Sequence, residues 1–236
     1  MATTRIVGRG RAGGALAGAL RSIGWHVELV GHDGTATAAQ GVDLLVLAVP
    51  DAVVAGVSRA VEPVDSTVVA HMAGSFGLDV LAPHARRASI HPLVALPNAE
   101  LGARRIAGGA WFAVAGDPIA TEVVLALGGR ALTVDDDDRA AYHAAAVIAS
   151  NHVVALLAQT ERVAASAGVP LEAYLDLVRA TIENVAELGS RAALTGPAAR
   201  GDAATIARHL EALSNEDRAL YEMLSEACRR LAACES

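Results

Sequence analysis

Three glycines near the start of the chain have the spacing of a phosphate-binding loop. Gly8, Gly10 and Gly13 form a G-x-G-x-x-G pattern directly after a short β-branched run and before a stretch of small residues. The first glycine of such a loop permits a tight turn, the second lets the backbone approach a pyrophosphate, and the third lets helix and strand pack. The helix that follows would offer unpaired N–H groups to the anion. The loop predicts dinucleotide binding, with a glycine-rich structural turn as the alternative.

Cofactor contacts are expected from the loop, from the end of the second predicted strand and from the end of a buried run. The expected cofactor-binding residues are Gly8, Arg9, Gly10, Arg11, Ala12, Gly13, His32, Ala48, Val49 and Pro50. After the second strand, a carboxylate would bind the ribose 2′-OH, whereas positive charge favours a 2′-phosphate. Asp33 suits NAD, while Arg9 and Arg11 favour NADP. We expect NADP(H), slightly favoured over NAD(H).

Histidine is the side chain best matched to proton transfer near neutral pH, and the chain has eight. His91 closes a short predicted strand, at the sheet edge where ligands of α/β proteins bind. His71 ends another strand, and the following turn with Gly74 and Ser75 could offer backbone N–H groups to an anion. His91 is therefore a candidate acid/base, and the other three are candidates for substrate binding. The alternative is that these residues only cap strands and form a turn.

The C-terminal half contributes further polar candidates. His143 and Ser150 are seven residues apart and would share a helix face, flanked by Asn151. This strip could line a cleft or be hydrogen-bonded across a helix interface. Arg200 and His209 could reach a substrate carboxylate, although a turn held by an Arg–Asp pair explains the same segment. We take His143 as a catalytic candidate and Arg200 as a substrate-binding candidate.

Composition excludes several chemistries. All 19 basic residues of the 236 are arginine, so Schiff-base chemistry and a Walker-type phosphate-binding lysine are excluded. The net charge of −7 argues against a nucleic-acid partner. The histidines lack the spacing of a zinc site, so no metal is expected.

The compartment and assembly are also predicted. The N-terminal segment lacks the pattern of a signal peptide, and apolar stretches such as 44–50 are too short to span a bilayer. Cys228 and Cys234 are too few for a disulfide scaffold and are expected to be reduced thiols in a cytoplasmic protein. The long Ala/Leu/Val faces after residue 139 predict a homodimer, with a small molecule as the other partner.

The elements that must position these residues follow from the hydrophobic pattern. Strands are expected at 5–7, 26–30, 44–49, 67–71, 88–91, 111–115 and 131–134, alternating with alanine-rich helices. From Asp138 onward only helical periods occur, at 139–168, 171–189 and from 205 to the C-terminus. We predict a Rossmann-type, doubly wound and mainly parallel α/β domain at 1–135, followed by an all-helical domain at 136–236. The aspartates at 135–138 are expected to cap the first helix of that domain.

Several longer motifs resemble a known family. They are the glycine loop, the segments 47–51, 71–75, 91–93, 142–146 and 150–152, and above all the string 193–205 followed by His209. Together they resemble the family that joins a Rossmann-like domain to a DUF2520 domain, within the wider 6-phosphogluconate-dehydrogenase-like group. The resemblance implies an active site between a dinucleotide domain and a helical domain that usually dimerises. One branch is described as a non-classical ketopantoate reductase, which implies an oxidoreductase acting on a small keto acid.

One departure from related dehydrogenases concerns the proton donor. Hydroxyisobutyrate-type dehydrogenases and ordinary ketopantoate reductases carry a Lys-x-x-x-Asn pair, and if Asn151 takes the place of that asparagine, Val147 stands where the lysine would be. A His-Pro pair like that of His91 resembles prephenate dehydrogenases, in which this histidine is catalytic and a serine in the position of Ser75 binds substrate. The resemblance therefore makes Asn151 and His91 catalytic candidates.

The expected function is NAD(P)H-dependent reduction of a small carboxylate-bearing ketone, with ketopantoate as the named substrate. An imine reductase or a prephenate-dehydrogenase-like enzyme is the alternative within the same class. A dinucleotide-binding sensor without turnover is the alternative outside it, because a chain that has lost the usual lysine could have lost catalysis.

Overall fold

The computed structural model describes residues 3–31 and 35–233, which form two compact units. The first unit comprises residues 1–150 and the second comprises residues 151–236. Within the first unit, the alternation of strands and helices ends at Thr133, the last residue of the last strand. The His32 and Asp33 positions, on which the choice between NAD and NADP depends, lie outside the described residues.

Seven strands of the first unit form one sheet, and each overlaps a run that the sequence predicts as a strand. They are β1 (Thr4–Val7), β2 (Val27–Val30), β3 (Leu44–Leu47), β4 (Val68–His71), β5 (Arg87–Pro92), β6 (Trp111–Gly116) and β7 (Arg130–Thr133). The strand order is β2-β1-β3-β4-β5-β6-β7. All neighbouring strands are parallel except β5 and β6, which are antiparallel. The predicted Rossmann-type, mainly parallel sheet is confirmed.

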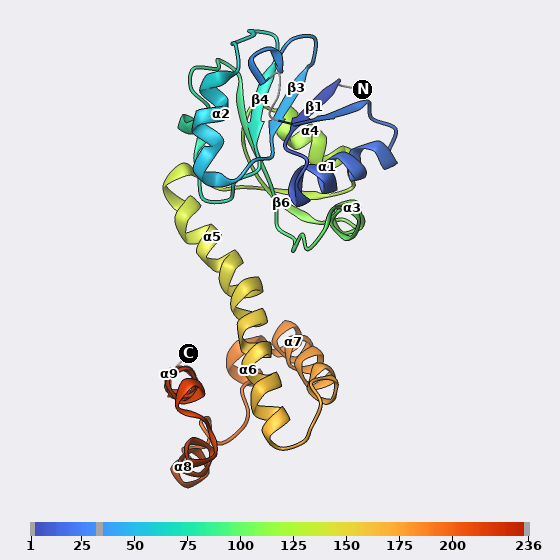
Figure 1. The fold of residues 1–236 in the computed structure, drawn as a ribbon. Coiled ribbons are helices and arrows are strands. Elements are labelled where there is room, and N and C mark those ends of the chain that lie inside the picture. The colour runs from blue at the N-terminus through green and yellow to red at the C-terminus, as the bar shows by residue number, and fades with distance from the viewer. Residues whose placement is uncertain (1–2, 32–34, 234–236) are drawn as a thin grey trace. The chain divides into compact units, whose positions relative to one another are not determined.

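Helices cover both faces of this sheet (Figure 1). The larger core lies under α1 (Arg11–Ser22), α3 (Ala99–Ala107) and α4 (Ile119–Ala126), and a smaller one lies under α2 (Val54–Ala60). Small residues let α1 and α3 approach closely, because a Cβ added at Gly14 would lie 2.8 Å from the Ala99 Cβ. The described part of the unit also contains four short 3-10 turns: η1 (Thr35–Thr37), η2 (Asp51–Val53), η3 (Leu78–Leu81) and η4 (Asp136–Asp138).

The helical part of the chain has more breaks than its sequence period predicts. The expected helix at 139–168 is α5 (Arg139–Val147), a π-helical turn (Ile148–His152) and α6 (Val153–Ser166). It is followed by α7 (Glu172–Ala193), α8 (Ala203–Ala212) and α9 (Asn215–Ala233). The prediction of a single helix from residue 205 onward is therefore wrong, because two helices, α8 and α9, cover this segment. Ser214 and Asp217 divide it, because the Ser214 hydroxyl donates to the Asp217 carboxylate at 2.8 Å and accepts from its N–H at 3.3 Å, which starts a new helix.

The aspartate run at 135–138 does not cap a helix through its side chains. Neither Asp135 nor Asp138, the two N-cap residues, has a side-chain capping hydrogen bond. The Asp136 carboxylate instead accepts a hydrogen bond from the Leu78 N–H at 3.2 Å, and it lies where a Cβ at Gly77 would be. The predicted capping role is therefore wrong. Asp136 holds the segment after β4 to the start of α5.

One helical run meets the length and composition of a membrane span, contrary to the sequence expectation. The run Asp136–Ser166 is long and apolar enough by these two criteria alone, because the π-helical turn joins two shorter helices into one. A single helix of this kind is weak evidence for a membrane.

Candidate functional site at the carboxyl edge of the sheet

The glycine loop between β1 and α1 is closely packed on one side and open on the other. Gly8 has a φ of +116°, and a Cβ there would lie 2.2 Å from the Ala48 carbonyl oxygen. A Cβ at Gly13 would lie 2.0 Å from the Gly8 carbonyl oxygen. At Gly10, by contrast, a Cβ would meet nothing within 4 Å. The loop therefore requires glycine for its own folding at two positions, and at the third the space beside the backbone is free for a ligand.

The N-terminus of α1 is suited to an anion. Its N-cap is Gly10, which provides no side-chain hydrogen bond, and the first turn contains no acidic residue. Arg9 and Arg11 are exposed on either side of Gly10. Free N–H groups, the helix dipole and two cations fit the pyrophosphate of a nicotinamide dinucleotide. Ala48 packs beneath the loop, and Val49 and Pro50 continue from β3 at the same edge of the sheet.

His91 and Tyr142 form a hydrogen-bonded pair at the end of β5. The His91 Nδ1 lies 2.7 Å from the Tyr142 hydroxyl oxygen, and the two rings meet edge to face with centroids 5.5 Å apart. Tyr142 comes from α5, 51 residues further along the chain. Both side chains are half-buried. A histidine and a phenol in direct contact can pass a proton between them and a bound molecule.

His143 and Gly74 complete this cluster. The His143 ring meets the His91 ring edge to face, with centroids 5.8 Å apart. Both rings lie against Gly74, where a Cβ would be 2.6 Å from the His143 Cδ2 and 2.9 Å from the His91 Nε2. Any larger residue at this turn would displace the imidazoles. The structure therefore brings together three residues that the sequence analysis singled out separately.

The buried guanidinium of Arg139 acts electrostatically on both His91 and Tyr142. Its side chain is 1% exposed, and one Nη donates to the Ser89 hydroxyl at 3.0 Å. Its Nε lies 4.0 Å from an Asp136 carboxylate oxygen, too far for a hydrogen bond. Among the described residues, the Nε and the second Nη have no hydrogen-bond partner. Burial lowers the pKa of Arg139, and the Asp136 carboxylate opposes that shift.

The environment shifts the pKa values of both members of the pair. Burial lowers the pKa of His91 from its ordinary 6.5 to about 4, and the charges of His143, Arg139 and His71 add to the effect. Burial also raises the pKa of the Tyr142 hydroxyl, and the charge of Arg139 opposes this. His91 is therefore neutral at neutral pH, and Tyr142 keeps its proton. Perturbed groups of this kind concentrate at functional sites.

His71 and Ser75 lie beside the cluster in different environments. His71 is fully buried, its Nε2 lies 3.2 Å from the Gly77 carbonyl oxygen, and its Nδ1 has no partner among the described residues. Burial lowers its pKa. The Ser75 hydroxyl is half-buried and donates weakly to the Asp51 carboxylate at 3.5 Å. His71 therefore contacts the backbone of the turn at Gly77 from within the core, while Ser75 is partly open to solvent.

Asn151 and Arg200 belong to the second unit. Asn151 lies in the π-helical turn, which breaks the α-helical spacing by which His143 and Ser150 were expected to share a face. Arg200 is exposed in the turn before α8. The expected Arg–Asp pair is not what holds this turn: the Asp202 carboxylate accepts from the N–H and hydroxyl of Thr205, at 3.0 and 2.8 Å, and so caps α8.

The sequence analysis missed Tyr142 and Arg139 as functional candidates. Tyr142 opens the segment 142–146, which was considered only for its family resemblance, and the signal for Arg139 was its place at the start of a helix that follows the last strand. Among the described residues, no group of three or more His, Cys, Asp or Glu side chains could hold a metal ion.

Comparison with known families identifies the two parts of the chain. A model of a Rossmann-like domain matches residues 32–97, and a model of DUF2520, a domain of unknown function, matches residues 112–228. The chain belongs to the family that joins these two domains. No curated protein matches the sequence of this Rossmann-like/DUF2520 protein.

Solved structures share the fold of this Rossmann-like/DUF2520 protein. A candidate NADP oxidoreductase from Bacteroides fragilis is 20% identical with a TM-score of 0.81, covering 97% of this chain and 98% of that one. Protein TM1727 from Thermotoga maritima is 22% identical with a TM-score of 0.74, covering 98% of both chains. A reductive aminase from Aspergillus terreus, in complex with NADPH4, cyclohexanone and allyl amine, is 17% identical with a TM-score of 0.64. The match covers 100% of this chain and 89% of the aminase chain. At these identities the likeness establishes the fold.

Proposed function

We propose that this protein is an NAD(P)H-dependent reductase of a small carboxylate-bearing ketone or of the related imine, with NADP(H) the favoured cofactor. The observation that carries the proposal is the His91–Tyr142 pair, which stands at the carboxyl end of β5 in the same sheet whose first strand opens into the glycine loop. Ligands of open α/β sheets bind at this edge. The solved structures of the same fold include a pyrroline carboxylate reductase with NADP bound and a reductive aminase in complex with NADPH, which supports the cofactor.

The residues that would hold the dinucleotide are the glycine loop, the N-terminus of α1 and the segment after β3. The open space beside Gly10 and the exposed Arg9 and Arg11 suit the phosphates, and Ala48 to Pro50 lie at the same edge. When bound, the reduced nicotinamide supplies a hydride to an electron-poor carbon. The chain itself must then supply a proton and fix the substrate.

Tyr142 is the proton donor that takes the place of the missing lysine. His91 is neutral at neutral pH, so it cannot serve as an imidazolium acid. In the tautomer with its proton on Nδ1, His91 donates to the Tyr142 oxygen and leaves the phenolic proton free for the substrate oxygen or nitrogen. The buried charge of Arg139 stabilises the phenolate that forms. The chain thus stabilises the charge that develops when the proton leaves.

The substrate class follows from the turn beside the pair. Ser75 is half-buried and its hydroxyl is held only by a 3.5 Å contact with Asp51, so it could turn to a substrate carboxylate, and ketopantoate is the named candidate. The reductive aminase and a pyrroline carboxylate reductase from Plasmodium falciparum share the fold, which keeps an imine substrate as the alternative.

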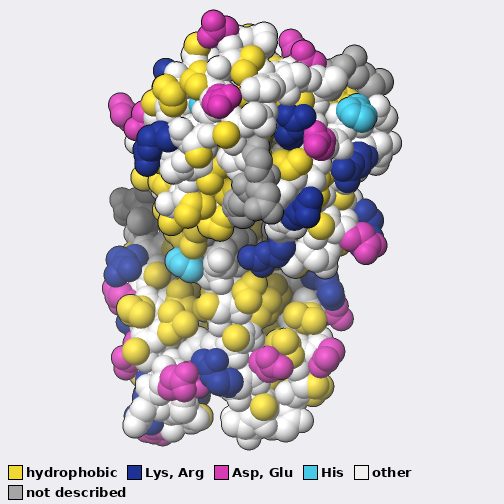
Figure 2. Space-filling view, turned by 45° about the horizontal axis from the view of Figure 1, so that its top comes forward, with side chains coloured by type: hydrophobic (Ala, Val, Ile, Leu, Met, Phe, Trp, Pro, Cys, Tyr) yellow, Lys and Arg dark blue, Asp and Glu magenta, His cyan; other side chains and the backbone are white. Residues whose placement is uncertain are grey.

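We also propose that the protein works as a cytoplasmic homodimer. No residue of α7 is buried, although the helix carries Leu177, Ile182 and Leu188, which are 62%, 60% and 59% exposed. Figure 2 shows hydrophobic side chains interspersed with charged ones on one face of the molecule. A second copy would remove this apolar surface from water. Cys228 has no disulfide partner among the described residues, and Cys234 lies outside them.

The experiment that tests the function separates binding from turnover. Calorimetric titration with NADPH and NADH measures binding, and oxidation of the reduced cofactor is then followed with ketopantoate and a panel of keto acids and cyclic imines. The Tyr142→Phe variant should lower kcat by roughly 100-fold or more, because general acid catalysis contributes that much. Its NADPH affinity should stay within about twofold, because the phenol is not part of the glycine loop.

Two variants serve as controls. His91→Gln should lower kcat, and its effect should not add to that of Tyr142→Phe, because the two side chains act through one hydrogen bond. His26→Gln changes an exposed histidine before β2 and should leave turnover unchanged. Unchanged turnover in Tyr142→Phe would remove the phenol from its role. Tight NADPH binding without turnover on any substrate would favour the sensor instead.

A further inference from the structure

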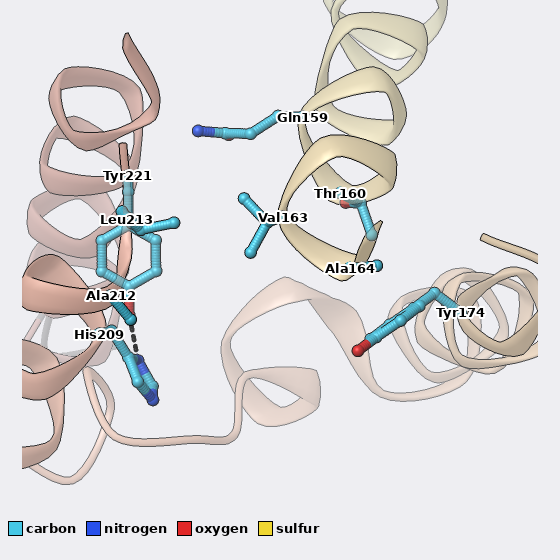
Figure 3. A pocket seen from close by; sticks show the side chains of 9 residues that line it. All are labelled: Gln159, Thr160, Val163, Ala164, Tyr174, His209, Ala212, Leu213 and Tyr221. Atoms are coloured by element: carbon cyan, nitrogen blue, oxygen red, sulfur yellow. Dashed lines mark hydrogen bonds between the residues drawn. The ribbon is translucent and has the colours of Figure 1, made fainter. Parts of the chain in front are cut away.

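A cavity in the second unit is separate from the residues of the proposed active site. It has a volume of about 470 Å³ and lies among α6, α7, α8 and α9 (Figure 3). Small-molecule sites in proteins have volumes of roughly 300–1,000 Å³. The cavity is lined by Gln159, Thr160, Val163, Ala164, Tyr174, His209, Ala212, Leu213 and Tyr221.

The wall of the cavity is apolar and carries no formal charge from an acid or an arginine. Val163 points into it from α6, and Leu213 and Ala212 face it from the end of α8 (Figure 3). Ala164 and Leu213 are almost fully buried at 3% and 9% exposure. None of the nine lining residues is Asp, Glu or Arg. A dinucleotide or another phosphate-bearing ligand would lose hydration here with no cation to pair it.

Polar groups lie on opposite sides of the cavity. The His209 Nδ1 lies 2.6 Å from the Tyr221 hydroxyl oxygen, with the rings edge to face, so each ring fixes the other. From α7, Tyr174 points its hydroxyl into the cavity (Figure 3). In the part of the chain that the structure describes, this hydroxyl has no hydrogen-bond partner. The Tyr174 hydroxyl and the His209 Nε2 are therefore available to one ligand.

We propose that this cavity binds a neutral, ring-containing small molecule. Its ring would pack on Val163 and Leu213, and a single hydroxyl or carbonyl group would bond to the Tyr174 hydroxyl or to the His209–Tyr221 pair. An apolar wall with few convergent polar groups is the usual composition of such a site. The proposal does not depend on the proposed reductase activity, because no residue of the glycine loop or of the His91–Tyr142 pair lines the cavity.

The test uses 2-naphthol as the neutral probe and 2-naphthoate as its charged counterpart. Binding to the full-length protein is followed by the fluorescence of each probe at pH 8. We expect saturable binding of 2-naphthol and binding of 2-naphthoate that is at least about tenfold weaker, since the cavity offers no cation to a carboxylate. Equal binding of the two probes, or no saturable binding of 2-naphthol, would overturn the proposal.

Three variants locate the probe. Ala212→Trp fills the cavity from an exposed position on α8, and it should weaken 2-naphthol binding at least about tenfold. Ala207→Trp makes the same change at another exposed alanine of α8 that does not line the cavity, and it should have no effect. Tyr174→Phe removes one hydroxyl and should weaken binding by about two- to tenfold, the value of one hydrogen bond.

A second copy of the chain is the competing occupant. If Ala212→Trp converts a dimer to a monomer by light scattering while Ala207→Trp does not, the cavity holds the second copy and the proposal is wrong. The NADPH affinity of Ala212→Trp should be unchanged whether the cavity holds a small molecule or a second copy. Failure of the cavity proposal is therefore distinguishable from failure of the proposed reductase function.

Discussion

Replacing His91 by glutamine should change how the stability of the first unit depends on pH. The folded His91 takes up a proton near pH 4, whereas the unfolded chain takes it up near 6.5. Between these values the unfolded state binds more protons than the folded state. The free energy of unfolding therefore falls as the pH is lowered through this interval, and glutamine, which does not titrate, removes that loss.

The size of the effect follows from the shift. A difference of one pKa unit corresponds to about 1.36 kcal/mol, so a shift from 6.5 to about 4 corresponds to about 3 kcal/mol below pH 4. At pH 5 the same shift corresponds to about 2 kcal/mol. At pH 8 it contributes nothing, because neither state is protonated. Burial also lowers the pKa of His71, and at pH 5 and above, where the folded His91 is largely neutral, that contribution is nearly the same in both proteins.

Urea unfolding followed by tryptophan fluorescence measures this difference. Both tryptophans, Trp25 and Trp111, belong to the first unit, so the signal reports on the unit that contains His91. The stability of His91→Gln relative to the wild type should rise by about 2 kcal/mol between pH 8 and pH 5. His26→Gln, an exposed change, should follow the wild type. Parallel curves for wild type and His91→Gln, or an NMR titration of the His91 ring with a midpoint near 6.5, would refute the assigned burial.

Three further predictions concern the cofactor loop, the buried arginine and the assembly. Gly10→Ala should weaken NADPH binding at least about tenfold in calorimetry, with a change of less than about 1 kcal/mol in unfolding, since its Cβ meets no protein atom within 4 Å. Arg139→Met should leave stability unchanged or raise it by about 1 kcal/mol, because two buried donors lack partners, while kcat falls; a loss above about 3 kcal/mol would contradict this. Ile182→Asp should shift sedimentation from dimer to monomer, and a dimer that persists in this variant would remove α7 from the interface.

The strands and the glycine loop could be predicted because their signals are local. Runs such as Leu44 to Leu47 are apolar and short, and each lies within a strand of the sheet. The antiparallel pairing of β5 and β6 could not be predicted, since strand direction depends on which distant segments meet. The break before α9 could have been predicted from the sequence, because Ser214 and Asp217 have the spacing of a capping box.

The site was only partly predictable. His91 and Gly74 were found from strand ends and turn chemistry, but their contact through the two imidazoles depends on how α5 packs. The π-helical turn after α5 has no clear sequence signal, and it changes the face on which each later residue of that helix lies. Helix periodicity alone therefore could not place the polar strip that contains His143.

The sequence by itself determined the glycine loop, the alternation of strands and helices and the absence of lysine, because each depends on residue types and short-range spacing. Only the tertiary structure decided that Tyr142 lies 2.7 Å from His91 and that Arg139 is buried beside them. Contacts between residues 51 positions apart, and the burial that shifts their pKa values, arise when α5 packs on the sheet edge. The candidate proton donor therefore came from packing, where the sequence had shown only that lysine was missing.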